Sequence, residues 1–197
     1  MSEVSLPEFF PEFGFQDERD SVNEILPRLF LTNFRGAADL KTLQLQNISC
    51  VVCVNGAADD NPHPKELAYL NIEGVEDEES HSETLCSHLK DAGLFIHQRR
   101  QEGKGVVVHC AAGITRSSTI VLFYLMQHEG MSLRGAFVHL KSKRRIVWPN
   151  CGFMKVLGEC EAEIFGLSAP TISPVDYGEW SSFDIEAYNA AKEVDRL

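Results

Sequence analysis

Residues 105–127, GVVVHCAAGITRSSTIVLFYLMQ, decide the class of fold to which this 197-residue chain belongs. The run 105–109 is rich in valine, which is typical of a strand buried on both faces of a sheet. Residues 119–127 are apolar all round and predict a helix buried inside the protein. Residues 110–116 form a short loop between the two. A buried strand that passes through a tight loop into a buried helix indicates an α/β architecture.

The rest of the chain alternates strand and helix patterns in the same way. Apolar, β-branched runs predict strands at 28–32, 48–54 and 67–72. Helical spacing of apolar residues predicts helices at 37–46, 82–100, 131–143 and from 150 to about 164. Ser132 and Asn150 are expected to cap the last two helices. The alternation predicts a central, parallel-rich mixed sheet flanked by helices.

Charge divides the chain into three parts. Residues 1–24 carry seven acidic residues and one Arg, and form a predicted acidic N-terminal arm. Residues 25–165 hold the predicted strands and helices and make up one domain. Residues 166–197 carry six acidic and two basic residues, and form a predicted acidic C-terminal tail with aromatic residues available to dock. Because 104–155 is the basic part of the domain, an anionic ligand is expected there.

The same composition excludes several classes of protein. Apolar runs fall short of the roughly 18 residues that a membrane span needs, and the N-terminus lacks the regions of a secretory signal. Six cysteines are too few for a disulfide scaffold, so we expect a reduced, intracellular protein. We place it in the cytoplasm and leave the nucleus open. Acidic termini argue against nucleic acid and membrane as partners, and the oligomeric state is left open.

The loop between the predicted strand and helix has the composition of an anion-binding site. Its residues Ala111, Ala112, Gly113, Ile114 and Thr115 leave the backbone N–H groups unobstructed. Gly113 can adopt a positive φ, and the helix N-terminus adds partial positive charge. Such a turn can surround one tetrahedral oxyanion with its amides.

Four side chains around this loop carry the predicted chemistry. The amides, the helix dipole and Arg116 would hold Cys110 as a thiolate, which is a strong nucleophile at neutral pH. Arg116 can grip two phosphate oxygens bidentately, a geometry that Lys cannot copy. Ser117 can donate its hydroxyl to the sulfur and help it to leave when a covalent intermediate breaks down. His109 is expected to orient the loop rather than to act as a base.

The pattern His109-Cys110-x-x-Gly113-x-x-Arg116-Ser117 resembles the signature of cysteine-dependent protein tyrosine phosphatases, and Ser after the Arg resembles their dual-specificity branch. Further segments that resemble this branch are Leu29-Phe30-Leu31, Tyr124-Leu125-Met126 and Pro149-Asn150-x-Gly152-Phe153-Met154. The resemblance covers residues 25–165 and implies a dual-specificity phosphatase catalytic domain with the protein tyrosine phosphatase-like fold. Since about 24 residues precede the first strand, we expect no rhodanese-like docking domain, and the chain resembles the small atypical members.

The resemblance also implies a mechanism. Cys110 would attack phosphorus, a general acid would protonate the leaving oxygen, and water would then hydrolyse the cysteinyl-phosphate. In the family the acid is an Asp on a separate loop, and residues 69–77 resemble the strand that leads to it. This points to Asp77, with Glu76, Glu78 and Glu79 as neighbours able to reach the site instead. Family phosphatases need no metal or cofactor, and the sequence has no H-x-x-H pair.

The expected partner is a phosphorylated protein in signalling. No Lys stands between Cys110 and Arg116, whereas related phosphatases of inositol lipids tend to place Lys there. We therefore expect hydrolysis of phosphotyrosine and of phosphoserine or phosphothreonine. The acids of 73–79 favour substrates with basic neighbours.

Three other classes of protein remain as alternatives. The first is a catalytically weak, phosphatase-like module that binds phosphorylated partners. The second is an RNA 5′-triphosphatase with a similar loop, against which the acidic termini argue. The third is a sulfur-transfer or arsenate-reducing enzyme, which the matches outside the loop disfavour.

Two other sequence features have structural interpretations. Cys50 and Cys53 have C-x-x-C spacing, but in a strand they point to opposite faces and are expected to be buried hydrophobes. A redox role, in which Cys53 or Cys86 traps oxidised Cys110 as a disulfide, is the alternative. The run Lys141-x-Lys143-Arg144-Arg145 is predicted to be solvated surface at a helix end.

Overall fold

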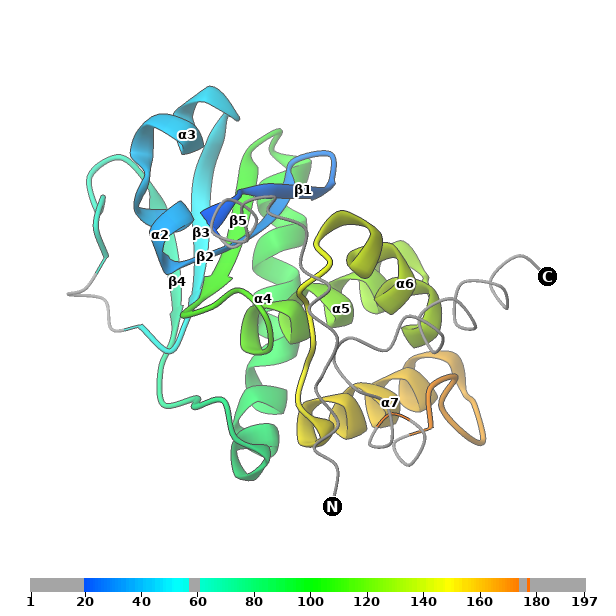
Figure 1. Ribbon diagram of the computed structural model, residues 1–197. Coiled ribbons are helices and arrows are strands. Elements are labelled where there is room, and N and C mark those ends of the chain that lie inside the picture. The colour runs from blue at the N-terminus through cyan, green and yellow to red at the C-terminus, as the bar shows by residue number, and fades with distance from the viewer. Residues whose placement is uncertain (1–19, 57–60, 174–176, 178–197) are drawn as a thin grey trace, which may run out of the picture.

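The computed structural model describes residues 20–56, 61–173 and 177, and these fold around a five-stranded sheet (Figure 1). The strands lie in the order β1-β2-β5-β3-β4. Their bounds are β1 Asn23–Leu26, β2 Leu29–Asn33, β3 Ile48–Val54, β4 Ala68–Ile72 and β5 Gly105–Cys110. β1 pairs antiparallel with β2, and the other pairings are parallel. The predicted parallel-rich mixed sheet is confirmed.

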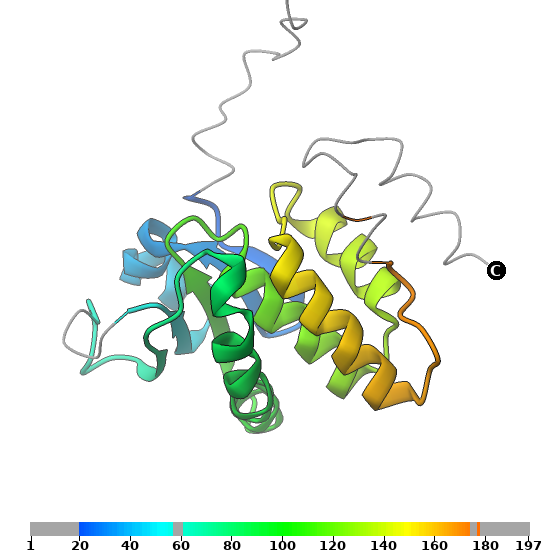
Figure 2. The same ribbon diagram turned by 90° about the horizontal axis from the view of Figure 1, so that it is seen from below.

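Helices cover both faces of this sheet. Four longer helices gather on one side of it (Figure 2), namely α4 Ser82–Gln101, α5 Arg116–Glu129, α6 Leu133–Lys143 and α7 Cys151–Phe165. The opposite face is covered by two short helices, α2 Phe34–Ala38 and α3 Leu40–Leu45. A 3-10 turn, η2 Glu79–His81, leads into α4.

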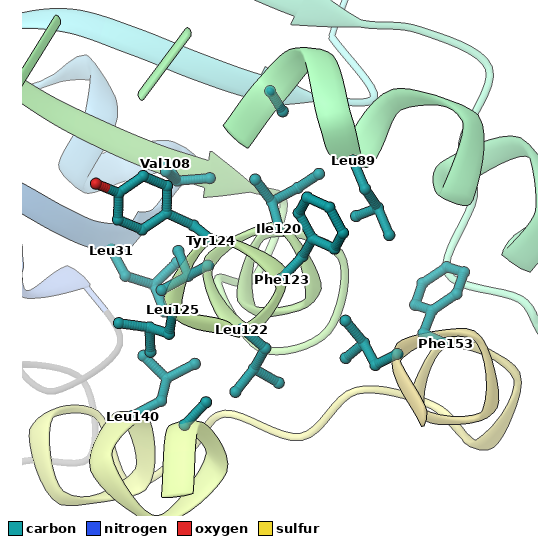
Figure 3. Close-up of a cluster of buried hydrophobic side chains, with 14 of the residues drawn as sticks. Leu31, Leu89, Val108, Ile120, Leu122, Phe123, Tyr124, Leu125, Leu140 and Phe153 are labelled. Atoms are coloured by element: carbon teal, nitrogen blue, oxygen red, sulfur yellow. The ribbon is translucent and has the colours of Figure 1, made fainter. Parts of the chain in front are cut away.

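The larger core surrounds α5. Every residue from Arg116 to Met126 is buried. The side chains of α5 radiate in all directions in Figure 3, toward Leu31 of β2, Val108 of β5, Leu89 of α4, Leu140 of α6 and Phe153 of α7. The predicted buried helix is confirmed. Its enclosure on every side holds the N-terminus of α5 fixed against the end of β5.

The helix predicted at 37–46 is wrong, because Asp39 divides it in two. Asp39 has φ −83° and ψ 82°, which are not helical values. Its carboxylate accepts from the Thr42 N–H at 3.2 Å and so begins a new helix. Of the apolar set proposed for the single helix, Leu43 is buried whereas Leu45 is 75% exposed.

The beginning of the described chain contains a strand that the sequence analysis did not predict. β1 pairs with β2 and buries Ile25. Its four residues are too few to show a clear period of two. Residues 1–19 of the predicted arm and residues 57–60 lie outside the described residues.

The C-terminal helices begin at their predicted caps. Ser132 accepts from the Gly135 N–H and Asn150 from the Phe153 N–H, each at 3.0 Å. Beyond α7, Ile172 and Tyr177 are buried, whereas 174–176 and 178–197 lie outside the described residues. No helix in the described part of the chain is both long and apolar enough to span a membrane.

Candidate active site

Residues 110–116 form a tight loop between β5 and α5. Cys110 is the last residue of β5, and Arg116 is the first residue of α5. The carboxyl edge of a parallel sheet is where α/β folds bind ligands. The first turn of α5 brings unpaired backbone N–H groups and partial positive charge to the same edge. The loop therefore lies where the sequence analysis predicts an anion site.

The sulfur of Cys110 lies at the floor of this loop. The residue is 3% exposed. Its Sγ accepts from the Gly113 N–H at 3.3 Å and from the Ser117 hydroxyl at 3.2 Å. Both donors can stabilise negative charge on the sulfur. The structure thus brings together Cys110, Gly113 and Ser117 as the motif predicts.

Gly113 is required by the shape of the loop. Its φ is +66°, a region that residues with a side chain rarely adopt. A Cβ at this position would lie 2.4 Å from the carbonyl oxygen of Thr32 in β2. Close packing against β2 thus brings the Gly113 N–H to the sulfur.

Arg144 holds the outer side of the loop, and sequence reasoning missed it. The residue is fully buried. Its Nε donates to the Gly113 carbonyl at 2.9 Å, and its Nη2 donates to the Ala112 carbonyl at 3.4 Å. Because each peptide unit is planar and trans, carbonyls turned toward Arg144 turn the N–H groups of the same peptide units away from it. Arg144 therefore helps to aim the N–H groups of Gly113 and Ile114 into the loop.

The predicted solvated surface at 141–145 is thus only half right. Lys143 and Arg145 are exposed, but Lys141 and Arg144 are buried. Lys141 lies with its Nζ 4.7 Å from the Trp148 ring and donates to the Arg145 carbonyl at 2.8 Å. A run of basic residues gives no sign of which members turn inward, so the sequence alone could not single out Arg144.

Arg116 is buried and is held by the acidic loop that follows β4. Its Nη1 donates to the Val75 carbonyl at 3.2 Å and lies 3.8 Å from a carboxylate oxygen of Glu76. Its buried Nε has no hydrogen-bond partner among the described residues. The guanidinium is therefore fixed in position and retains a donor for an anionic ligand.

Cys110 and Arg116 line one cavity of about 500 Å³. Its wall also includes Phe34, Asn55 and Glu76. The Asn55 amide donates to Glu76 at 2.9 Å and holds that carboxylate at the wall. Nucleophilic sulfur, guanidinium and carboxylate therefore face the same space.

Asp77 does not line this cavity. Its carboxylate is exposed and accepts from the Asn150 side-chain amide at 3.2 Å. The structure therefore brings Glu76, rather than Asp77, to the cavity wall. Glu78 and Glu79 are exposed on the same loop.

Comparison with known proteins places this site in a family. The family model of the dual specificity phosphatase catalytic domain matches residues 29–163. The chain belongs to the dual specificity phosphatase family. Members of the family are protein phosphatases, and the chain carries their catalytic domain.

Individual relatives agree with this assignment. Dual specificity protein phosphatase 22 of Xenopus tropicalis is 36% identical over 138 residues, which are 70% of this chain and 64% of that protein. Slingshot homolog 3 of Mus musculus is 38% identical over 141 residues, 71% of this chain and 21% of that protein. The chain thus spans less than two thirds of the length of either relative.

Solved structures share the fold of the phosphatase domain. Human DUSP28 has a TM-score of 0.67 at 28% identity, covering 72% of this chain and 93% of that one. The human tyrosine phosphatase-like serine/threonine/tyrosine-interacting protein has a TM-score of 0.66 at 31% identity, covering 72% and 96%. The predicted phosphatase fold is confirmed.

His109 of the phosphatase domain is a buried, neutral imidazole. Burial lowers its pKa to about 4, partly offset by a hydrogen bond with the backbone of Cys110. Its Nδ1 has no partner among the described residues. The predicted role of His109 in orienting the loop stays a prediction.

Cys50 and Cys53 are both buried, as the structural interpretation predicts. Cys50 lies in the larger core, and Cys53 faces the other side of β3. Cys53 is paired in register with His109, so the sheet directs Cys53 and Cys110 to opposite faces, although both residues line the same cavity at its carboxyl edge. Among the described residues, no group of His, Cys, Asp and Glu could hold a metal ion.

Proposed function

We propose that this domain hydrolyses phosphotyrosine and phosphoserine or phosphothreonine in proteins through a cysteinyl-phosphate intermediate. One observation carries the proposal. The Cys110 sulfur, with donors from Gly113 and Ser117, lies in the wall of the cavity that Arg116 also lines. Nucleophile and phosphate-binding group therefore meet a substrate from the same space.

In the first step the Cys110 thiolate attacks phosphorus in line with the ester oxygen. The S–P bond forms as the P–O bond breaks, and the departing oxygen takes a proton from a general acid. The N–H groups of the loop and the Arg116 guanidinium bind the non-bridging oxygens. This chemistry uses side chains and backbone alone and needs no metal or cofactor.

In the second step water attacks the cysteinyl-phosphate. The carboxylate that gave up its proton takes one from the water, and the S–P bond breaks. Ser117, 3.2 Å from the sulfur, donates to the thiolate as it leaves. Inorganic phosphate then departs and the free enzyme returns.

Asp77 is the proposed general acid, and Glu76 is the second candidate. The family resemblance points to Asp77, whose carboxylate accepts from the Asn150 side-chain amide. Glu76 lines the cavity, which favours it as the acid. Its carboxylate, however, accepts from the Asn55 amide and lies 3.8 Å from the Arg116 guanidinium. Glu76 stands where phosphate would meet the guanidinium, so it is better suited to holding Arg116 before the substrate binds.

The proposed substrate is a phosphorylated protein with basic residues near the phosphate. The loop at 111–115 contributes no cation. Glu73, Asp77, Glu78 and Glu79 are exposed next to Glu76 in the chain, where they would repel a free dianion and attract basic side chains. The acidic termini support the proposal that nucleic acid and membranes are not partners. The low cysteine content supports the proposal that the protein acts in the cytoplasm or nucleus.

A phosphatase-like binding module is the second candidate function. One structural neighbour is named as phosphatase-like and interacting, so the fold also occurs under such a description. The placement of Asp77 outside the cavity wall favours this candidate. Cys110 and Arg116 line one cavity, and Ser117 donates to the Cys110 sulfur, which favours turnover.

The test is phosphate release from phosphotyrosine and phosphothreonine peptides with basic flanks. We expect the wild type to turn over both, and Asp77→Asn to lower the rate by about 10²–10⁴, the usual contribution of a general acid. Glu76→Gln should cost far less, and Glu159→Gln, at an exposed position of α7, is the control. A large loss in Glu76→Gln alone would make Glu76 the acid. A wild type that binds both peptides without turnover would be a binding module.

A further inference from the structure

One segment of the chain contacts both the loop that holds Cys110 and the acidic loop that follows β4. We call residues 144–150, which join α6 to α7, the bridging segment. We call residues 110–116 the catalytic loop. Arg144 donates to carbonyls of this loop, and the Trp148 N–H donates to the Ile114 carbonyl at 2.9 Å. Asn150, at the other end, holds Asp77. The bridging segment therefore sets the distance between the catalytic loop and the acidic loop.

Tyr177 closes over the bridging segment from the C-terminal side. Its hydroxyl donates to the Pro149 carbonyl at 2.7 Å. Its ring stacks on Trp148 at 5.0 Å with an interplanar angle of 20°, and meets the edge of Phe137 at 5.9 Å. The residue is 1% exposed, and burial raises its pKa, so the phenol keeps its proton and remains a donor.

The bond to Pro149 controls the orientation of Asn150. The Pro149 carbonyl and the Asn150 nitrogen belong to one planar peptide unit, so fixing the carbonyl fixes the direction in which Asn150 begins. From there the Asn150 side chain does two things at once. Its oxygen caps α7, and its amide donates to Asp77. A turn of this peptide unit would move the amide away from Asp77.

We propose that Tyr177 is a positioning residue of this phosphatase, acting through Pro149 and Asn150 on the acidic loop. The inference rests on the proposed function, with Asp77 as the general acid. It gives Tyr177 a part in the reaction, although its side chain does not line the cavity.

Tyr177→Phe is the direct test, because it keeps the ring and removes only the hydroxyl. We expect kcat on a phosphotyrosine peptide to fall about 5- to 30-fold, the range that corresponds to losing one buried hydrogen bond. KM should stay within about twofold, since the phosphate-binding loop is retained. With 4-nitrophenyl phosphate, whose leaving group needs little protonation, the rate should change less than about twofold.

Tyr124→Phe is the matched control. Tyr124 is also fully buried, and its hydroxyl bonds with Arg100 and Glu129, away from the bridging segment. Tyr124→Phe also removes a buried phenolic oxygen, but its kcat on the phosphotyrosine peptide should match that of the wild type. Equal effects of both variants on both substrates would overturn the proposal and leave Tyr177 with a purely structural part.

A double variant tests the route of the effect. Adding Tyr177→Phe to Asp77→Asn should cause no further loss on peptides, because the acid is already absent. A full additional loss would overturn the route through Asp77. Absence of turnover in the wild type would instead refute the proposed function, and the role of Tyr177 with it.

Discussion

At the scale of a single residue, the burial of His109 ties stability to pH. Its pKa is about 4 in the folded protein against 6.5 for an exposed His. The unfolded chain therefore takes up this proton first as pH falls. Titration of His109 therefore leaves the free energy of unfolding unchanged well above pH 6.5 and lowers it progressively toward pH 4. By pH 5 the loss should reach about 2 kcal/mol.

Urea unfolding of the wild type and His109→Gln at pH 7.5 and pH 5 measures this contribution. Carboxylates that titrate over the same range are common to both proteins and cancel in the comparison. The wild type should lose about 2 kcal/mol more than the variant over this interval. Equal losses would show that His109 is not held neutral by burial.

Single residues were predictable where the chemistry lies in one contiguous stretch. The structure brings together Cys110, Gly113 and Ser117 as the motif predicts. They lie within one tight loop and the first turn of the helix that follows it. Arg144 lies 31 residues further on, and only the fold brings it to Gly113. The same holds for Glu76 and its place in the cavity wall.

At the scale of elements, the end of α6 holds the catalytic loop in shape. Arg144→Met removes the donors to the Gly113 and Ala112 carbonyls and leaves buried acceptors unpaired. We expect kcat/KM to fall about 10- to 100-fold, corresponding to roughly 1.4–2.7 kcal/mol in transition-state binding. Arg144→Lys should rescue little, because an ammonium cannot reproduce the planar fork.

Arg145→Met is the control for this change. Arg145 is exposed and adjacent, and its backbone carbonyl, which the substitution retains, accepts from Lys141. Peptide hydrolysis by this variant should match the wild type within about twofold. If Arg144→Met hydrolysed peptides as fast as Arg145→Met, Arg144 would have no part in shaping the loop.

Elements with strong local signals were predicted, and those set by tertiary contacts were not. The valine-rich β5 and the all-apolar α5 were evident, and Ser132 and Asn150 marked helix starts. The break at Asp39 depends on a side-chain cap that competes with helix continuation. Strand β1 exists because it pairs with β2, and its four residues carry no pattern of their own.

At the scale of the whole molecule, the site is assembled from segments far apart in the chain. Hydrogen bonds join the acidic loop to Arg116 and the bridging segment to both loops. Tyr177 in turn bonds to the bridging segment. The alternation of elements predicted a parallel-rich sheet, but not its strand order, which rests on long-range pairing. The carboxyl ends of parallel strands lie along one edge of the sheet, so the loop after β5 could be placed at that edge from the sequence. The bridging segment and Tyr177, which support this loop, could not be placed from the sequence.

The most direct measurement is to trap phosphate on the enzyme. Wild type mixed with a phosphotyrosine peptide, quenched in acid and digested, should carry phosphate on the fragment containing Cys110. Cys110→Ser should carry none and show no turnover while still binding the peptide, and Cys151→Ser, at an exposed cysteine, should match the wild type. Phosphate on another residue, or turnover that persists in Cys110→Ser, would contradict the proposed mechanism.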